Sequence, residues 1–548
     1  MEKRLLLAIV LSFLVLVFYQ ALFLKKEPPP EPGPITQPGI ITETEQSTAQ
    51  KVQETEPPPQ IEEKTEFQPS TAQNEEEIVI ETSLYRAVWS NRGAVLKSWK
   101  LKKYLDDNKE QEYEIVPASS AEINKYPFSL NTDDPAFDLI LNSSLYATDQ
   151  YALELTNGES GELRFEFADE NGNRVEKVLT FKDGTYVFDI QVFVWKNGQN
   201  SNFRTIWGPG IGNPAADAAK QGFGKSSGMA VFAANKVYRM DERKYKPEQS
   251  VYNFVNWAAY EDNYFTALFV TSGQNTSAAL IKEEKDMVPY FFLVLNNAQK
   301  VYIGPKAYDE LNQTGYQAQK LVKFGFFGFI AELLYRAIKG IHKSVPNWGF
   351  SIIILTLIIK IIFFPLTYSS SKSMAKMQEL QPKLKALKAK YKKAKQDISQ
   401  RRKLNEETMA LYKEHGVNPA GGCLPMLIQL PIFWGFFRLL LVAVEFRHAP
   451  FILWVTDLSV KDPYYVTPIL MGITQFISQK MTPTSADSSQ QKMMLIMPVV
   501  MTIFFMNFQS GLVLYWLTNN VLQIGQQYIT NRLMNKKKRE THAKRRKK

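Results

Sequence analysis

The sequence predicts an α-helical polytopic membrane protein, with six transmembrane helices and an antiparallel β-sandwich domain between the first helix and the other five. Three observations support this fold class: apolar runs of membrane-spanning length at both ends, alternating apolar and polar residues in the middle, and uneven charge. Residues 25–347 hold 34 Lys and Arg against 44 Asp and Glu, a net −10 in a chain of +10, which leaves +20 for the rest. Such a division is expected when parts of one chain lie in different compartments.

The first predicted element is a transmembrane anchor over residues 1–26. Its apolar run Leu5–Leu24 would be ~30 Å long as a helix, the thickness of a bilayer core. A cleaved signal peptide is the alternative, but the run is too long and no small-residue cleavage site precedes Lys25. Residues 27–77 are rich in Pro, Glu, Gln and Thr, and this composition predicts a disordered linker.

Residues 78–318 have the pattern of a β-sandwich. Leu163–Phe167 and Phe188–Val192 alternate apolar and polar side chains, and the turn pairs Asn171-Gly172 and Asp183-Gly184 lie between them. With a basic start in the cytoplasm, this domain would lie on the outer side of the membrane.

Residues 321–344 place Phe and Leu beside regularly spaced charges, which predicts an amphipathic helix in the membrane interface. The alternative is an ordinary surface helix of the β-domain.

Five further spans are expected after residue 345. They cover approximately 348–367, 424–444, 464–479, 493–508 and 512–530, with the turn-like Asn507–Gly511 dividing the last apolar run. Segment 369–421 has 13 basic and 5 acidic residues, and the tail 532–548 has 10 basic residues and one acidic residue. Segment 445–463 has two basic and three acidic residues. By the positive-inside rule the first two are cytoplasmic and the third is outside, so both termini are cytoplasmic.

No convincing active site is present in the sequence. Ala219–Ser226 fits a relaxed phosphate-loop pattern and Gly224–Gly228 a nucleophile-elbow pattern, but neither follows an apolar strand. The chain has one Cys and 4 widely spaced His. We therefore expect no enzyme, no cofactor and no metal site.

Polar residues inside the predicted spans are more informative. Lys360 has apolar neighbours on both sides, and a central lysine costs ~2.5–3.5 kcal/mol on insertion scales. It could face a hydrated cavity or reach the cytoplasmic surface, and both interpretations stay open. Thr356 lies four residues earlier, on the same helix face. Polar side chains also occur in other spans: Gln429, Gln475, Gln479, Thr518, Asn519, Asn520 and Gln523, beside Tyr515 and Trp516. They predict either a shared hydrated cavity or hydrogen bonds between helices.

The cytoplasmic segment 369–421 predicts a helical hairpin. Met374, Met377, Leu380, Leu384 and Leu387 recur at steps of three and four, which indicates one apolar helix face. Its excess of Lys and Arg could bind anionic lipids, ribosomal RNA or acidic peptide, or could simply be solvated.

Several segments closely resemble the YidC/Oxa/Alb family of membrane protein insertases. They are NWGFSIIILTLIIKIIFFPLT, SMAKMQELQPKLKAL, MALYKEHGVNPAGGCLPMLIQLPIF, DPYYVTPILMG, QKMTPT and SGLVLYW. The likeness is specific over about 345–531, and the anchor, linker and β-domain resemble the Gram-negative form with a large periplasmic domain more loosely.

The resemblance implies a five-helix insertase core over 345–531, enclosing a hydrophilic groove open to cytoplasm and lipid but closed outside. The groove charge of most members is an Arg, and the matching residue here is Lys360. The expected groove residues are Lys360, Thr356, Gln429, Gln475, Tyr515 and Trp516, and the expected hydrophobic slide is Pro425, Phe433, Met497 and Phe505. Arg438 does not match the family pattern.

The implied function is insertion and folding of proteins in the bacterial inner membrane, alone or with the Sec translocon (SecYEG and SecDF). Nascent membrane proteins, the ribosome and anionic lipids are the other expected partners. Two alternatives are a small-solute transporter with an extracytoplasmic binding domain, and a scaffold for cell-envelope assembly. No internal repeat supports the transporter.

Overall fold

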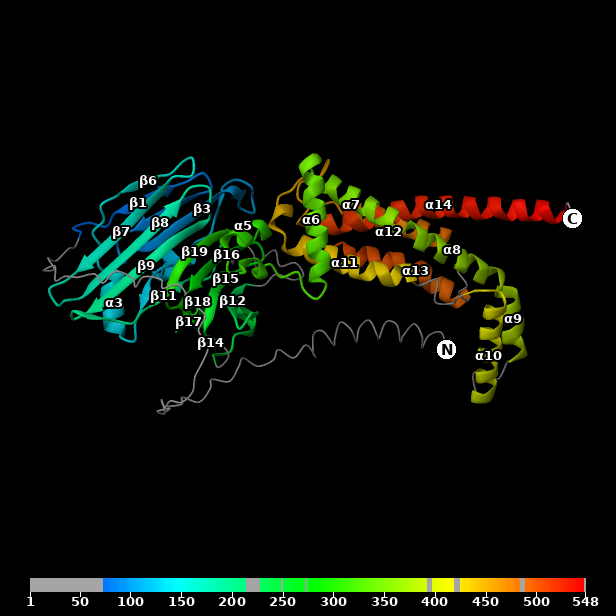
Figure 1. Cartoon of the computed structure of the whole chain (residues 1–548), viewed down its shortest axis with the longest axis horizontal. Helices are drawn as coiled ribbons and strands as arrows, with labels where there is room; N and C mark the ends of the chain where they lie inside the picture. Colours follow the sequence, from blue (N-terminus) through cyan, green and yellow to red (C-terminus); the bar gives the residue numbers. More distant parts are fainter. Residues whose placement is uncertain are drawn as a thin grey trace, which may run out of the picture.

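The computed structural model has a β-rich domain and a helical region arranged end to end (Figure 1). The structure describes residues 72–546 except 213–226, 248–249, 272, 274, 392–396, 418–423 and 483–487, and only the backbone of 424–427, 488–493 and 535–546. The predicted anchor 1–26, the linker up to residue 71 and the pattern Ala219–Ser226 lie outside the described residues.

Three sheets form the β-rich domain. The first has the order β4-β3-β2-β1-β6 and comprises β4 (Glu112–Glu114), β3 (Val95–Leu105), β2 (Tyr85–Ser90), β1 (Glu77–Glu81) and β6 (Ala152–Glu154). Its neighbouring strands are antiparallel except β1 and β6, which pair in parallel. The third sheet, β14-β17-β18-β11-β5, comprises β14 (Val251–Asn253), β17 (Ser277–Lys285), β18 (Val288–Leu295), β11 (Arg204–Trp207) and β5 (Leu130–Asn131).

The second sheet has nine strands and is the largest. Eight follow the order β13 (Lys236–Asp241), β12 (Gly228–Ala233), β15 (Val255–Glu261), β16 (Phe265–Thr271), β19 (Ala298–Pro305), β9 (Val187–Lys196), β8 (Arg174–Lys182) and β7 (Ser160–Ala168), and β10 (Gln199–Asn200) pairs with β9. The pairs Asn171-Gly172 and Asp183-Gly184 connect β7 to β8 and β8 to β9, with both glycines at positive φ. The turn chemistry therefore gives the antiparallel hairpins that the sequence predicts.

Large aromatic side chains fill the space between the sheets. Trp99 of β3 stacks on Phe188 of β9 with ring centroids 5.7 Å apart. Trp207 of β11 meets Phe269 of β16 edge to face at 6.0 Å. Because these contacts join the first and third sheets to the second, one continuous apolar core holds the domain together.

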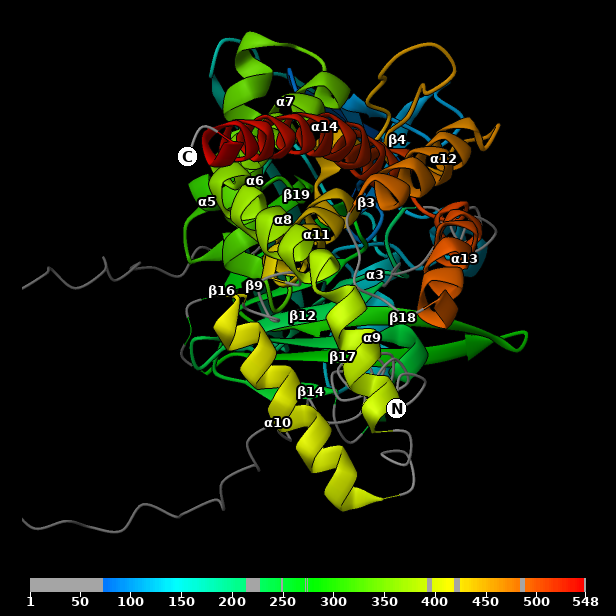
Figure 2. The same cartoon turned by 90° about the vertical axis from the view of Figure 1, so that its right-hand side faces the viewer.

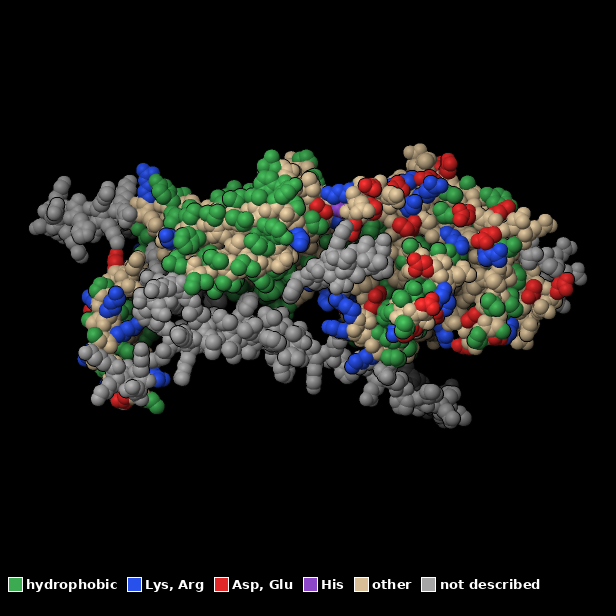
Figure 3. All heavy atoms as spheres, turned by 180° about the vertical axis from the view of Figure 1, so that it is seen from behind, with side chains coloured by type: hydrophobic (Ala, Val, Ile, Leu, Met, Phe, Trp, Pro, Cys, Tyr) green, Lys and Arg blue, Asp and Glu red, His purple; other side chains and the backbone are tan. Residues whose placement is uncertain are grey.

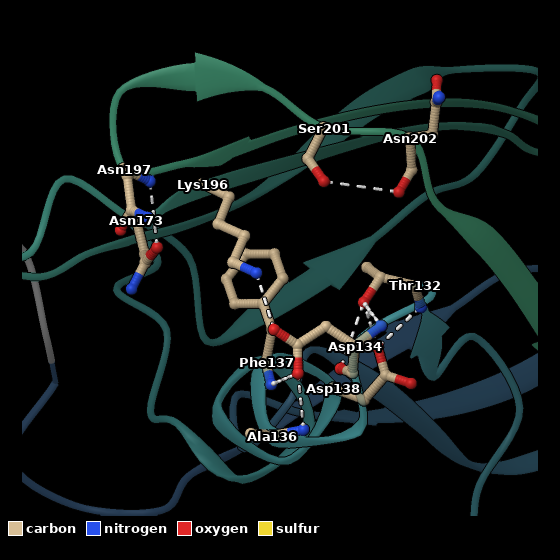
Figure 4. A network of polar contacts seen from close by, with 10 residues as sticks. All are labelled: Thr132, Asp134, Ala136, Phe137, Asp138, Asn173, Lys196, Asn197, Ser201 and Asn202. Carbon is tan, nitrogen blue, oxygen red and sulfur yellow. Dashed lines mark hydrogen bonds and ion pairs between the residues drawn. The ribbon is translucent and has the colours of Figure 1, made fainter.

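Helix α3 (Pro135–Ser143) is fixed at the edge of the domain by a polar network (Figure 4). The Asp134 carboxylate accepts from the backbone N–H groups of Ala136 and Phe137 and pairs with Lys196 at 2.6 Å. The hydrogen bond from Lys196 and those from the helix N–H groups lower the pKa of Asp134. This N-cap therefore ties α3 to the end of β9.

The remaining short elements of the domain are α2 (Ser119–Ile123), η1 (Glu242–Lys244), α5 (Tyr308–Thr314) and η3 (Ala318–Leu321). After η3 the chain enters the helical region. Its elements are α6 (Gly328–Ser344), α7 (Trp348–Ile362), α8 (Phe364–Glu379), α9 (Gln381–Lys390), α10 (Ile398–Glu414), α11 (Leu424–Val442), η5 (Val444–Phe446), α12 (Val466–Met481), α13 (Ser488–Phe505) and α14 (Ser510–Arg546). Figure 2 shows α9 and α10 side by side, projecting from the other helices.

The expected span 348–367 is not one straight helix, because the helix breaks between α7 and α8 with a 60° bend. Pro365, in the first turn of α8, has no N–H to continue the hydrogen bonds of α7. This bent pair has the length and composition to cross a membrane, whereas no single helix among the described residues does. Ile428–Val442 and Met494–Phe505 are shorter apolar stretches.

The surface of the helical region is mostly hydrophobic on the face seen in Figure 3, whereas charged side chains are spread over the β-rich domain. Ile361, Ile496 and Ile503 are 61–63% exposed. A surface made mostly of exposed apolar side chains is expected where lipid, and not water, surrounds a protein.

The loop between α11 and α12 docks on the β-rich domain. The Arg447 guanidinium pairs with Asp107 at 3.0 Å and donates to the Leu105 carbonyl at 2.6 Å. It also lies over the rings of Tyr113 and Phe265, at 5.0 and 5.5 Å from their centroids. Arg447 therefore contributes several of the contacts that join the two regions.

Candidate functional site

A cavity of about 370 Å³ lies between α7, α8, α11, α12 and α14. Its lining combines apolar residues with many polar ones. The polar and indole side chains are Thr356, Lys360, Thr367, Ser370, Ser371, Gln429, Gln475, Ser478, Thr482, Tyr515, Trp516, Asn519, Asn520, Gln523 and Gln527. The structure thus brings all six predicted groove residues to one site.

Helix α7 supplies the charged face of the cavity. The Asn347 side chain caps α7 by accepting from the Phe350 N–H at 3.1 Å. Thr356 and Lys360 are four residues apart and line the cavity together. The Thr356 hydroxyl donates to the Ile352 carbonyl at 2.6 Å, which satisfies this buried group within its own helix.

Lys360 is the one charged residue among the described residues that line the cavity, and the lining holds no Asp or Glu. Its ammonium group donates to Gln523 Oε1 on α14 at 2.9 Å. An amide oxygen satisfies one of three N–H donors and does not neutralise the charge. The cavity therefore carries a net positive charge that an acidic side chain could balance.

Neighbouring polar side chains bridge the helices around this charge. The Trp516 indole N–H donates to Gln475 Oε1 at 3.2 Å, which joins α14 to α12. Asn520 donates to the Met471 carbonyl at 3.2 Å across the same pair of helices. Both predicted roles of these residues, cavity lining and helix-to-helix hydrogen bonding, therefore occur together.

The cavity ends against apolar packing on the side of the β-rich domain. Tyr515 stacks on Phe436 with ring centroids 4.2 Å apart, and Leu440 and Val513 beyond it are fully buried. The Asn347 amide also donates to the Phe451 carbonyl at 3.1 Å, so the α11–α12 loop is held over the start of α7. This packing closes the cavity on the side away from α8.

Comparison with known proteins agrees with this architecture. The family described as 60Kd inner membrane protein matches residues 340–538, and the YidC periplasmic domain matches residues 77–337. The membrane protein insertase YidC of Syntrophus aciditrophicus is 37% identical, over 97% of this chain and 100% of the relative. The chain belongs to the YidC family of membrane protein insertases.

Other insertases of the family give the same result. The YidC proteins of Geotalea uraniireducens and Geobacter sulfurreducens are each 36% identical over 97% of this chain, and the matches cover 99% and 98% of those proteins. The predicted fold class, function and inner-membrane location are confirmed: a periplasmic β-rich domain precedes a helical insertase core. The activity is non-enzymatic, and its substrates are nascent membrane proteins. The family membership therefore favours the insertase over the transporter and the scaffold.

The residues expected to form the hydrophobic slide of this insertase do not share one surface. Phe433 lines the cavity and meets Trp516 edge to face at 4.9 Å. Met497 is 40% exposed on α13, but Phe505 is only 2% exposed. Phe505 packs between Phe433 and Phe508, so its side chain offers no surface to lipid. The side chain of Pro425 lies outside the described residues.

Two other predicted polar residues of the insertase lie away from the cavity. Arg438 donates to the carbonyl of Lys323, just before α6, and so adds no charge to the groove. Gln479 does not line the cavity, and its Oε1 is buried without a hydrogen-bond partner among the described residues.

Sequence reasoning missed the cytoplasmic part of the cavity. Ser371 on α8 donates to Gln527 Oε1 on α14 at 3.4 Å, and both residues line the cavity together with Lys360. A signal was present, because Trp516, Asn519, Gln523 and Gln527 follow each other at steps of three and four. Ser370 and Ser371 gave none, since the sequence placed them outside the spans.

Proposed function

We propose that the cavity is the groove through which the polar flank of a nascent membrane segment begins to cross the bilayer. Lys360 attracts acidic residues of this flank, because no carboxylate among the described lining residues neutralises it. The amides and hydroxyls of the groove offer hydrogen bonds part-way across, which lowers the cost of moving polar groups through hydrocarbon. The uncompensated charge of Lys360 is the observation that carries the proposal.

The apolar part of the substrate would leave the groove sideways into lipid. Phe433 borders the cavity, and Met497 is accessible on α13. Val499, Val500 and Ile503 are at least half exposed on the same helix and extend this apolar surface. Since lipid solvates these side chains, a hydrophobic segment can exchange one apolar contact for another at little cost.

The cytoplasmic hairpin over 369–421 and the basic tail 532–548 would receive the substrate. Lys390 pairs with Glu407 at 2.9 Å across α9 and α10, which is one contact between the two arms of the hairpin. The basic residues around it are suited to the ribosome and to anionic lipids. Cooperation with the Sec translocon (SecYEG and SecDF) belongs to the same proposal.

The proposed domain layout follows the sequence. Residues 1–26 anchor the chain, 27–77 link the anchor to the periplasmic domain 78–318, and 321–344 lie in the membrane interface. In the last of these, the exposed Phe329 and Leu333 of α6 would contact lipid.

Site-specific crosslinking tests the groove. A photoreactive residue at Gln429 or Gln475 should react with the polar flank of a ribosome-bound nascent chain, and one at Met497 with its apolar segment. The same probe at Phe193, an exposed residue of the periplasmic domain, is the control. Equal crosslinking at Gln475 and Phe193 would contradict the proposed path.

A further inference from the structure

Arg438 is a cation near the periplasmic end of α11 that does not serve the groove. Its Nη2 donates to the Lys323 carbonyl at 2.6 Å, and this is its one acceptor among the described residues. Its Nε is buried and has no hydrogen-bond partner in the part of the chain that the structure describes. A guanidinium has five N–H donors and keeps its charge, so most of its hydrogen-bonding capacity is unused here.

The packing of α6 on α11 directs Arg438 toward the start of α6. At Gly435 the two helices approach so closely that a Cβ would lie 2.9 Å from Ile330 Cγ2. Arg438 is three residues further on and therefore on the same face of α11. Gly325, at φ +79°, lets the incoming chain turn around the guanidinium, because a Cβ there would lie 3.2 Å from Arg438 Nε.

The segment that Arg438 contacts has the composition of a membrane interface. Residues 320–329 contain Lys320, Lys323 and four Phe but no acidic residue. Lys323 is exposed. Phe326 and Phe329 are 79% and 82% exposed. Basic groups beside exposed aromatic rings are typical of the level where headgroups meet acyl chains.

Among the described residues, Arg438 donates to a backbone carbonyl and to no carboxylate. The Arg239 guanidinium donates to the Leu321 carbonyl at 2.7 Å, so a second cation is bound to the same segment. Arg239 has its own carboxylate in Glu261, at 2.9 Å, whereas Arg438 forms no ion pair among the described residues. An anion from outside the chain would therefore be stabilised beside Arg438.

We infer that Arg438 and Lys323 bind the phosphodiester of a phospholipid headgroup in the periplasmic leaflet, with Phe326 and Phe329 beside its acyl chains. Phosphate oxygens can accept two parallel N–H bonds from a guanidinium, the geometry for which Arg is suited. A lipid is the source because the site adjoins exposed aromatic rings, which a free anion would not cover. This site is separate from the groove, and its occupation would fix the angle at which α6 meets α11.

Native mass spectrometry of the full chain in detergent, titrated with phosphatidylglycerol, tests the inference. The unmodified protein should retain one lipid that Arg438→Gln binds about tenfold more weakly, as expected for the loss of charge-assisted hydrogen bonds of about 1.4 kcal/mol. Arg438→Lys keeps the charge and should lose less. The matched control is Arg336→Gln, since Arg336 lies on α6 with its side chain 66% exposed and pairs with Glu332.

Two outcomes would overturn the inference. One is equal lipid binding by the unmodified protein and Arg438→Gln, when gel filtration shows both to be monodisperse. The other is displacement of the bound lipid by millimolar inorganic phosphate, which would make the site one for free anions. If Arg438→Gln does not fold, the comparison of Arg438→Lys with Arg336→Gln decides, because equal lipid binding by these two variants would also reject the site.

Discussion

The ammonium group of Lys360 on α7 donates to the side-chain oxygen of Gln523 on α14, 2.9 Å away. The two residues are 163 positions apart in sequence and join the first helix of the insertase core to its last. Gln523 orients the lysine without neutralising it. The charge is therefore held at one position of the cavity, and no carboxylate among the described lining residues opposes it.

Replacement of Lys360 should affect substrates according to their charge. Lys360→Ala is expected to reduce insertion of a substrate with an acidic translocated tail at least about tenfold, because a charge-assisted hydrogen bond is worth about 1.5–3 kcal/mol. Lys360→Arg keeps the charge and should preserve insertion. The measurement is protease protection of the tail in cells depleted of the native insertase, with an uncharged tail as control. Undiminished insertion of the acidic tail by Lys360→Ala would rule out the role of this lysine.

A carboxylate at position 523 should neutralise the groove from within. Gln523→Glu would pair with Lys360 at the distance now occupied by the amide, and the pair would no longer attract acidic substrates. Insertion of the acidic tail should fall about as far as in Lys360→Ala, while the uncharged tail is inserted normally. Gln523→Leu distinguishes the loss of the hydrogen bond from the loss of net charge, since it removes the acceptor of Lys360 but leaves the lysine charge. Greater loss with Gln523→Leu than with Gln523→Glu would contradict this account.

Asp183 should make the stability of the periplasmic domain depend on pH. Its carboxylate accepts from the Ser83 and Gly158 N–H groups at 2.8 and 3.1 Å, and the bonds from Ser83, followed by that from Gly158, lower its pKa to about 2. The folded-state pKa lies below the value of 3.8 for an unperturbed Asp, so this stabilisation is present above about pH 4 and lost as pH falls toward 2.

The variant Asp183→Asn should lower the free energy of unfolding by about 1–2 kcal/mol at pH 7. The measurement is the melting temperature of the full chain in detergent between pH 7 and pH 2.5. The difference in melting temperature between Asp183→Asn and the unmodified protein should become smaller as the pH falls toward 2.5. Asp286→Asn, in the exposed turn between β17 and β18, is the control and should show no such trend. A constant difference over the whole range would disprove the assignment.

Arg447 should determine how firmly the periplasmic domain is attached. Arg447→Ala removes the ion pair with Asp107, the bond to the Leu105 carbonyl and the contact with two rings. The expected cost is about 1–3 kcal/mol of docking free energy. Amide hydrogen exchange in residues 104–113 should accelerate about tenfold, while insertion of test substrates changes less than twofold. Lys461→Ala, an exposed change in the same loop, should leave the exchange unaltered.

The patterns of apolar and polar residues predicted the hairpins of this protein better than the pairing of strands distant in sequence. Alternation in Leu163–Phe167 and the turn pairs around Gly172 and Gly184 correctly predicted β7, β8 and β9. The parallel pairing of β1 with β6 left no local signal, since it joins residues more than 70 positions apart. Local residue types specify turns, whereas parallel neighbours are decided by packing of the whole domain.

The cavity was predictable where its residues lie within apolar spans. A polar residue there is conspicuous, so Thr356, Gln429, Gln475 and the stripe on α14 could be identified together. Ser370 and Ser371 were not predicted as lining residues. The apolar run ends near Pro365, and α8 continues beyond it with polar residues. The burial of Phe505 was also missed, because an apolar side chain looks the same in sequence whether it meets lipid or another helix.

The break after α7 has a geometric consequence. Because the chain turns by 60° at Phe363, only three residues beyond Lys360, the charged residue lies on one arm of the bend and Ser370 and Ser371 lie on the other. A straight helix of the same sequence would direct both parts of the cavity lining along a single axis.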